Sequence, residues 1–128
     1  MNENELAKLV FDCGLNVHKA LGPGLLESSY EECLFYELSK HNIWIEKQKT
    51  LPLIYEEVKL EIGYRVDLLI ENKLVVEIKS VEAINEIHLA QVLTYLKLSN
   101  CKLGLLINFN TTLFKNGVKR IINGNLNL

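Results

Sequence analysis

Apolar side chains recur at helical spacing over the first forty residues. The pattern predicts one helix from about residue 3 to 21 and a second, with Leu26 and Tyr30 on its apolar stripe, that stops near His41. Gly22-Pro23-Gly24 lies between them and ends the first helix. It lacks the lysine and the preceding strand of a phosphate-binding loop, so we interpret it as a corner between two helices.

The pattern changes to strands after the second helix. Short apolar stretches at residues 43–51, 53–55 and 58–62 predict strands, and Pro52 predicts an edge position or a bulge. Further on, residues 84–99 return to helical spacing. Residues 103–107 read as a buried strand, and 111–122 are compatible with a closing helix. This order predicts an α/β sandwich with a mixed central sheet flanked by helices.

Two segments in the middle of the chain predict a hairpin. Residues 66–70 and 74–78 are rich in branched apolar side chains, and residues 71–73 between them are polar. If those three residues form the loop, Asp67 lies opposite Glu77 and Arg65 lies opposite Lys79. The register therefore brings two acids and two bases together.

Alternation along the strands assigns side chains to faces. The four charged residues share one face, and the other face holds Val66, Leu68, Ile70, Val76 and Ile78. Two carboxylates placed across a hairpin repel each other unless a cation lies between them. Carboxylate and carbonyl oxygens suit a hard divalent cation such as Mg²⁺. The same alternation is also typical of the solvated face of any antiparallel sheet.

Composition limits the remaining possibilities. The 128 residues suit one domain, residues 1–128, with a frayed tail at 123–128, and three widely spaced cysteines favour free thiols. The net charge of −2 argues mildly against a protein that coats nucleic acid, although Lys47, Lys49 and the basic residues at 115–120 allow a modest positive rim. The acidic start and the lack of a long apolar run predict a cytoplasmic protein without a membrane segment.

Other polar residues accompany the predicted helices. Glu27 falls in the first turn of the second helix, where the helix dipole favours an acid whatever its function, and Tyr30 follows on the same side. His88, Gln91 and Tyr95 line one face of the later helix. They suit either phosphate contacts or the rim of a core helix.

These residues, in this order, resemble a known family. Glu27, Asp67, the run from Glu77 to Lys79, and Gln91 with Tyr95 are similar to the restriction-endonuclease-like PD-(D/E)xK nuclease superfamily, particularly its branch with a Q-x-x-x-Y helix, as in RecB-like and Cas4-like nucleases. The segment from Gly24 to Tyr30 is similar to the small bacterial GxxExxY proteins, in a match from about residue 8 to 122. No proline precedes Asp67, which departs from the superfamily name. The resemblance implies an αβββαβ core.

The resemblance also implies roles for the residues. Asp67, Glu77, the carbonyl of Ile78 and Glu27 would bind Mg²⁺ or Mn²⁺, and Lys79 would orient or deprotonate the attacking water. The expected contacts to phosphate or substrate are Gln91, Tyr95, Arg65, His88 and Tyr30.

The expected activity is hydrolysis of DNA, in preference to RNA, to leave 5′-phosphates. Two alternatives stay open. One is an inactive nuclease-fold module that binds nucleic acid or docks a protein. The other is a structural subunit whose residues 103–109 contribute to a dimer, since the resemblance allows a homodimer or a larger protein partner.

Overall fold

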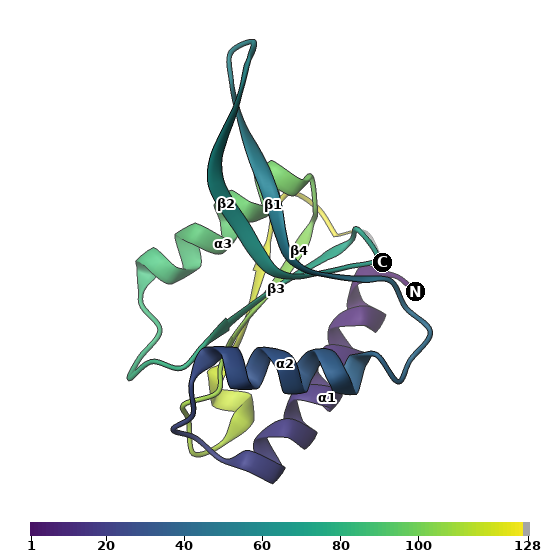
Figure 1. Ribbon diagram of the computed structural model, residues 1–128, viewed down its shortest axis with the longest axis vertical. Helices are drawn as coiled ribbons and strands as arrows, with labels where there is room; N and C mark the ends of the chain where they lie inside the picture. Colours follow the sequence, from purple (N-terminus) through teal and green to yellow (C-terminus); the bar gives the residue numbers. More distant parts are fainter. Residues whose placement is uncertain (127–128) are drawn as a thin grey trace.

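A five-stranded mixed sheet with the order β1-β2-β3-β4-β5 forms the centre of the computed structural model, which describes residues 1–126 (Figure 1). Helices cover both faces of this sheet, as the order of helices and strands along the chain predicts. The elements are α1 Glu3–Leu21, α2 Glu27–Leu38, β1 Ile45–Tyr55, β2 Val58–Ile70, β3 Leu74–Lys79, α3 Glu86–Ser99, β4 Leu103–Asn108, the 3₁₀ helix η1 Phe114–Gly117 and β5 Val118–Ile122.

The corner between α1 and α2 is a hydrogen-bonded unit. The backbone of Gly22 has a φ of 68°, which suits glycine, and its N–H donates to His18 to end α1. The hydroxyl of Tyr30 donates to the carbonyl of Gly22 and accepts from the N–H of Leu25. The helix-helix corner predicted for Gly22-Pro23-Gly24 is therefore confirmed, and the buried Tyr30 is part of what holds it together.

The predicted hairpin register is confirmed. Strands β2 and β3 are antiparallel, and Leu68 pairs with Val76 while Ile70 pairs with Leu74. Residues 71–73 connect the two strands, as expected. β3 then pairs with β4 in parallel, and α3 forms the crossover between them.

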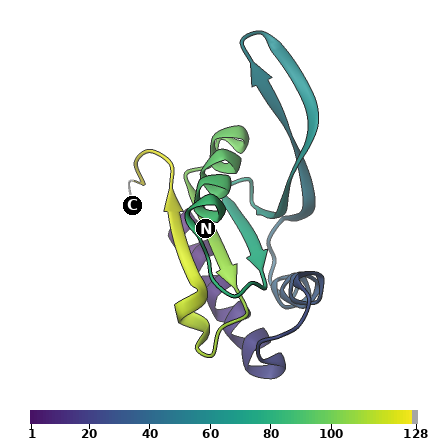
Figure 2. The same cartoon turned by 90° about the vertical axis from the view of Figure 1, so that its left-hand side faces the viewer.

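The first two strands are longer than the sequence suggested. The short strands predicted at 53–55 and 58–62 are the outer parts of β1 and β2, which form one long hairpin that projects from the body (Figures 1 and 2). The β1–β2 register shifts between Leu51 and Leu53, so the bulge expected at Pro52 is confirmed. We call residues 51–64 the hairpin arm.

Two apolar clusters lie on opposite faces of the sheet. The first joins the sheet to α1 and α2, and the second joins it to α3. Four residues of the predicted inner face lie in the first cluster, as expected: Leu68, Ile70, Val76 and Ile78.

Val66 lies on the other face, so its predicted placement is wrong. It belongs to the second cluster with Leu69, whereas strict alternation would group it with Leu68. The change of face occurs next to Asp67, at the point where the β1–β2 ladder lacks a pair between Gln48 and Asp67. A local backbone irregularity therefore reverses the alternation.

The end of the chain differs from the prediction as well. Residues 111–122 form η1 and β5 rather than a closing helix, because β4 offers a free edge and Val118 to Ile122 pair with it antiparallel. Branched residues favour this strand. Strand β4 is fully buried between β3 and β5, which contradicts a dimer contact through residues 103–109.

The tail stays close to the body as far as the structure describes it. The N–H of Asn123 donates to Lys102, and Leu126 packs against the first cluster. Residues 127–128 of the tail expected to fray lie outside the described residues. No helix within residues 1–126 has the length and apolar character to cross a membrane.

Helix α3 packs closely on the sheet through a glycine. A Cβ atom added to Gly104 of β4 would come 2.8 Å from Cγ1 of Val92 and 3.3 Å from Leu96. Glycine therefore sets the distance between α3 and β4. Gln91 and Tyr95 lie on the same helix.

Candidate active site

A polar hollow of about 220 Å³ opens where β2 and β3 separate. Seven of the ten residues proposed from the sequence line it, and they come from four different elements. Its lining residues are Glu27 of α2, Gln48 of β1, Gly63, Arg65 and Asp67 of β2, Glu77 and Lys79 of β3, and Gln91 and Tyr95 of α3.

The hollow forms where the side chain of Asp67 takes the place of a backbone hydrogen bond between β2 and β3. Backbone pairing between β2 and β3 ends at Leu68 and Val76, one pair short of Asp67 and Glu77. The N–H of Ile78 instead donates to Oδ2 of Asp67 over 2.8 Å. The two strands can therefore part at this point without leaving that amide unsatisfied.

Glu77 is the most unusual group in the hollow. Only 4% of its surface is exposed, and its Oε1 is the one buried side-chain oxygen or nitrogen within residues 1–126 that has no hydrogen-bond partner. Burial, followed by the neighbouring Asp67 carboxylate, raises the pKa of Glu77 to about 10, although Lys79 lowers it. A buried acid in this state requires either a proton or a cation.

The donor set fits a hard divalent cation. Asp67 and Glu77 supply carboxylate oxygens, and the unpartnered Oε1 is free to bind. Within residues 1–126 no group of three or more histidine, cysteine, aspartate or glutamate side chains is placed to hold a metal. A cation on this acidic pair would thus keep several water ligands, which is typical of Mg²⁺. Ile78 follows Glu77 directly, and its side chain points into the core.

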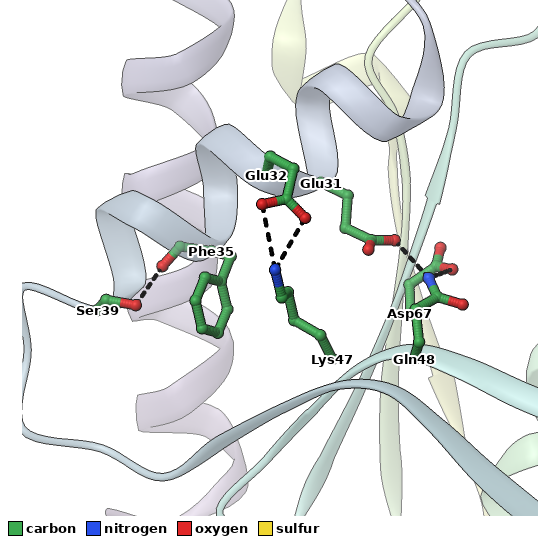
Figure 3. A network of polar contacts seen from close by, with 7 residues as sticks. All are labelled: Glu31, Glu32, Phe35, Ser39, Lys47, Gln48 and Asp67. Atoms are coloured by element: carbon green, nitrogen blue, oxygen red, sulfur yellow. Dashed lines mark hydrogen bonds and ion pairs between the residues drawn. The ribbon is translucent and has the colours of Figure 1, made fainter.

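Lys79 differs from the other lysines of the neighbourhood. It is half-buried beside the acidic pair, and in the described part of the chain it forms no ion pair within 4.0 Å. Lys47 contacts Glu32 and Lys49 contacts Glu46, each at 2.9 Å. Figure 3 shows the Lys47–Glu32 pair. The positive rim expected from Lys47 and Lys49 is therefore neutralised by adjacent glutamates.

Glu27 lies exposed at the mouth of the hollow, at the first position of α2. Its Oε2 accepts from the N–H of Ser80 over 3.4 Å, and the hydroxyl of Ser80 donates to the carbonyl of Leu25 over 2.6 Å. These contacts connect the start of α2 to the residue after Lys79. Glu27 thus faces the acidic pair from another element.

Helix α3 contributes two of its three proposed residues. Gln91 and Tyr95 line the hollow, and burial, followed by Glu77 and Asp67, raises the pKa of Tyr95. His88 does not line it, because its Nδ1 accepts from the N–H of Asn85 and caps the helix. Tyr30 is also absent from the lining, since it lies in the core and stacks on Phe109. We therefore remove His88 and Tyr30 from the proposed site.

Two polar residues near the acids were not identified from the sequence. The amide of Gln48 lies between the carboxylates of Asp67 and Glu31, within hydrogen-bond distance of both (Figure 3). Burial raises the pKa of Glu31, and Asp67 raises it further, while the hydrogen bond from Gln48 lowers it. Glu31 lies one helical turn after Glu27, and this spacing was the only sequence signal for it.

Comparison with known protein families shows which family the chain belongs to. A sequence comparison with curated proteins finds no match. A model of the PD-(D/E)XK nuclease superfamily matches residues 4–121, which is most of the chain and includes every residue that lines the hollow. The mixed sheet flanked by helices is consistent with the restriction-endonuclease-like fold of these nucleases. The chain belongs to the PD-(D/E)XK nuclease superfamily.

Proposed function

We propose that this protein is a Mg²⁺- or Mn²⁺-dependent nuclease that hydrolyses DNA in the cytoplasm and leaves 5′-phosphates. We further propose that it belongs to the Q-x-x-x-Y branch and to the GxxExxY group. One observation carries the proposal. The buried oxygen of Glu77 has no partner and lies beside a second carboxylate in a polar hollow, and a cation bound there can take the place of the proton that this buried acid otherwise holds.

The residues of the hollow would have two separate roles, cation binding and activation of the attacking water. Asp67 and Glu77, with the carbonyl of Ile78 and Glu27 at the mouth, would hold the cation. When bound, the cation supplies Lewis-acid activation of the scissile phosphate. Lys79 would orient or deprotonate the attacking water and stabilise the negative charge that builds on the phosphate oxygens.

Three further side chains would position the substrate. Gln91 and Tyr95 reach the hollow from α3, and Arg65 lies exposed at its edge on β2. The amide and guanidinium groups can donate to phosphate oxygens, and arginine can do so with two parallel hydrogen bonds. The open side of the hollow thus offers donors to a nucleic-acid backbone, while the closed side holds the acids.

Cleavage assays with matched variants test the proposal. Purified protein is incubated with single-stranded, double-stranded and branched DNA and with RNA, first in EDTA and then in Mg²⁺ or Mn²⁺. We expect metal-dependent cleavage of DNA that Glu77→Ala and Lys79→Ala abolish. Glu57→Ala, on the hairpin arm, and Lys97→Ala, on α3, lie outside the hollow and should cleave like the parent.

The same experiment distinguishes the second candidate function. An inactive nuclease-fold module would bind nucleic acid without cleaving it, and Glu77→Ala would bind as well as the parent. Metal would then change neither the melting temperature nor the activity. That combination of results would overturn the enzyme and favour the binding or docking module.

A further inference from the structure

Gln48 interrupts strand β1 at the level of the acidic pair. Lys47 pairs with Leu68 and Lys49 pairs with Val66, yet the residue between them forms no pair with Asp67. Gln48 has a φ of 51°, in the left-handed region. This conformation costs a residue other than glycine on the order of 1 kcal/mol, so the surrounding contacts must hold it in place.

The side chain of Gln48 makes those contacts. Its Nε2 donates to Oε1 of Glu31 over 2.8 Å and to Oδ1 of Asp67 over 3.1 Å (Figure 3). A primary amide has two N–H groups, and both are directed to carboxylates here. The amide therefore bridges Glu31 of α2 and Asp67 of β2 and offsets part of their repulsion.

The second oxygen of Asp67 is fixed by a different group. Oδ2 accepts from the N–H of Ile78 over 2.8 Å, next to Glu77 in β3. Each oxygen of Asp67 thus has its own donor, and the plane of the carboxylate is determined from both sides. Without Gln48, the carboxylate could rotate about its side-chain bonds and move away from Glu77.

We propose that Gln48 is a positioning residue that orients Asp67 toward the cation shared with Glu77. The inference rests on the proposed metal-dependent function and deepens it, because it assigns the orientation of one ligand to a residue on another strand. Partners that hydrogen-bond to metal ligands typically contribute 10- to 100-fold in metal affinity. Glu31 acts here as a neighbour of Gln48 and not as a ligand.

Titration calorimetry with Mn²⁺ tests the inference directly. Gln48→Gly removes the amide and accepts the left-handed backbone without strain. We expect it to bind Mn²⁺ about tenfold more weakly than the parent. The matched control is Glu56→Gly, which changes another left-handed residue of the same hairpin, with a φ of 56°, outside the hollow. It should bind Mn²⁺ like the parent.

Glu31→Gln provides the second measurement. Gln48 still donates to Asp67 in this variant, so Mn²⁺ affinity should stay within about twofold of the parent. An equal loss in Glu31→Gln and Gln48→Gly would mean that Glu31 itself binds the cation, and would overturn the inference. Steady-state cleavage adds a further readout, since a positioning role lowers kcat and leaves the KM for DNA unchanged.

The outcomes separate this inference from the proposed function. If the parent binds Mn²⁺, Glu77→Ala does not, and Gln48→Gly binds as tightly as the parent, only the role of Gln48 is overturned. If the parent gives no binding heat, the proposed function fails and the inference fails with it. Melting temperatures of all variants are recorded so that loss of folded protein is not counted as loss of affinity.

Discussion

The two halves of strand β2 differ in which side chains they expose to water and which they bury. Its outer half, in the hairpin arm, exposes apolar side chains, and Val58 and Ile62 are 53% and 55% exposed. Its inner half, from Val66 to Ile70, is mostly buried and yet brings Asp67 next to a buried glutamate. The same strand thus exposes apolar side chains at its outer end and holds the half-buried Asp67 at its inner end.

The difference follows from what covers each half. The arm is a two-stranded ribbon in which Tyr55 pairs with Val58 and Leu53 pairs with Leu60, so its apolar residues contact each other across the strands. The inner half lies in a five-stranded sheet between helices on both faces. Exposed apolar groups cost little, whereas a buried charge costs several kcal/mol, so only the inner half requires a functional explanation.

Replacing the buried acid should produce the largest effect. Glu77→Gln keeps the size of the side chain and removes its charge, so we expect cleavage to fall by at least about 10²-fold. The metal-free variant should also melt at a higher temperature than the parent near neutral pH, because the parent must take up a proton at Glu77 when it folds and the glutamine need not. Glu57→Gln, in the arm, should change neither value. Equal activity of the two variants would contradict the assignment of the site.

Removing apolar groups from each half tests the packing side of the comparison. Leu68 is fully buried in the first cluster, so Leu68→Ala should lower the free energy of unfolding by about 2–5 kcal/mol. Ile62→Ala, in the arm, should lower it by about 0.5 kcal/mol or less. Urea denaturation measures both. A large loss for Ile62→Ala would show that the arm packs against something in solution.

The pH dependence of stability should reflect the ionisation of Glu77. Its pKa is raised from 4.5 to about 10 in the folded state, so the folded protein holds a proton that the unfolded chain releases. The folded state binds more protons between these values, and the free energy of unfolding therefore falls as the pH rises. The contribution of Glu77 to the free energy of unfolding is greatest below its unfolded pKa of 4.5. It is lost as the pH rises toward the folded pKa of about 10.

Calorimetric melting in EDTA measures this effect. Between about pH 5 and pH 9 the melting temperature of the parent should fall by at least about 5 °C relative to Glu77→Gln. Mn²⁺ should reduce the difference, because the cation replaces the proton as the partner of the carboxylate. A parallel pH profile for the two proteins would show that Glu77 ionises normally in the folded state.

The register of the inner half could be predicted from the sequence because it depends on local features. Branched apolar residues on both sides of a three-residue polar loop were enough to place Leu68 opposite Val76, and hence to bring Asp67 and Glu77 together. The corner at Gly22 and the bulge at Pro52 were predictable for the same reason. In each case the backbone preference of a few neighbouring residues decided the structure.

The features that were missed depend on distant parts of the chain. The face of Val66 changes at the level where Gln48, on the neighbouring strand, adopts a left-handed conformation, which nothing in a glutamine predicts. Residues 118–122 form a strand because β4 offers a free edge, and helical spacing alone could not reveal it. Tyr30 matched a family motif and was therefore expected at the site. Its hydroxyl instead donates to the carbonyl of Gly22, away from the hollow.

The turn at the tip of the arm gives the smallest predicted effect. Glu56 and Glu57 connect Tyr55 to Val58, and Glu56 has a φ of 56°. A two-residue hairpin turn that needs a positive φ at its first position favours glycine there. Glu56→Gly should therefore raise the free energy of unfolding by up to about 1 kcal/mol, and Glu57→Gly should not. Mn²⁺ affinity should be the same in both variants, because the tip does not line the hollow. A change in that affinity would mean that the arm and the acidic half of β2 are coupled, and that the contrast between them is incomplete.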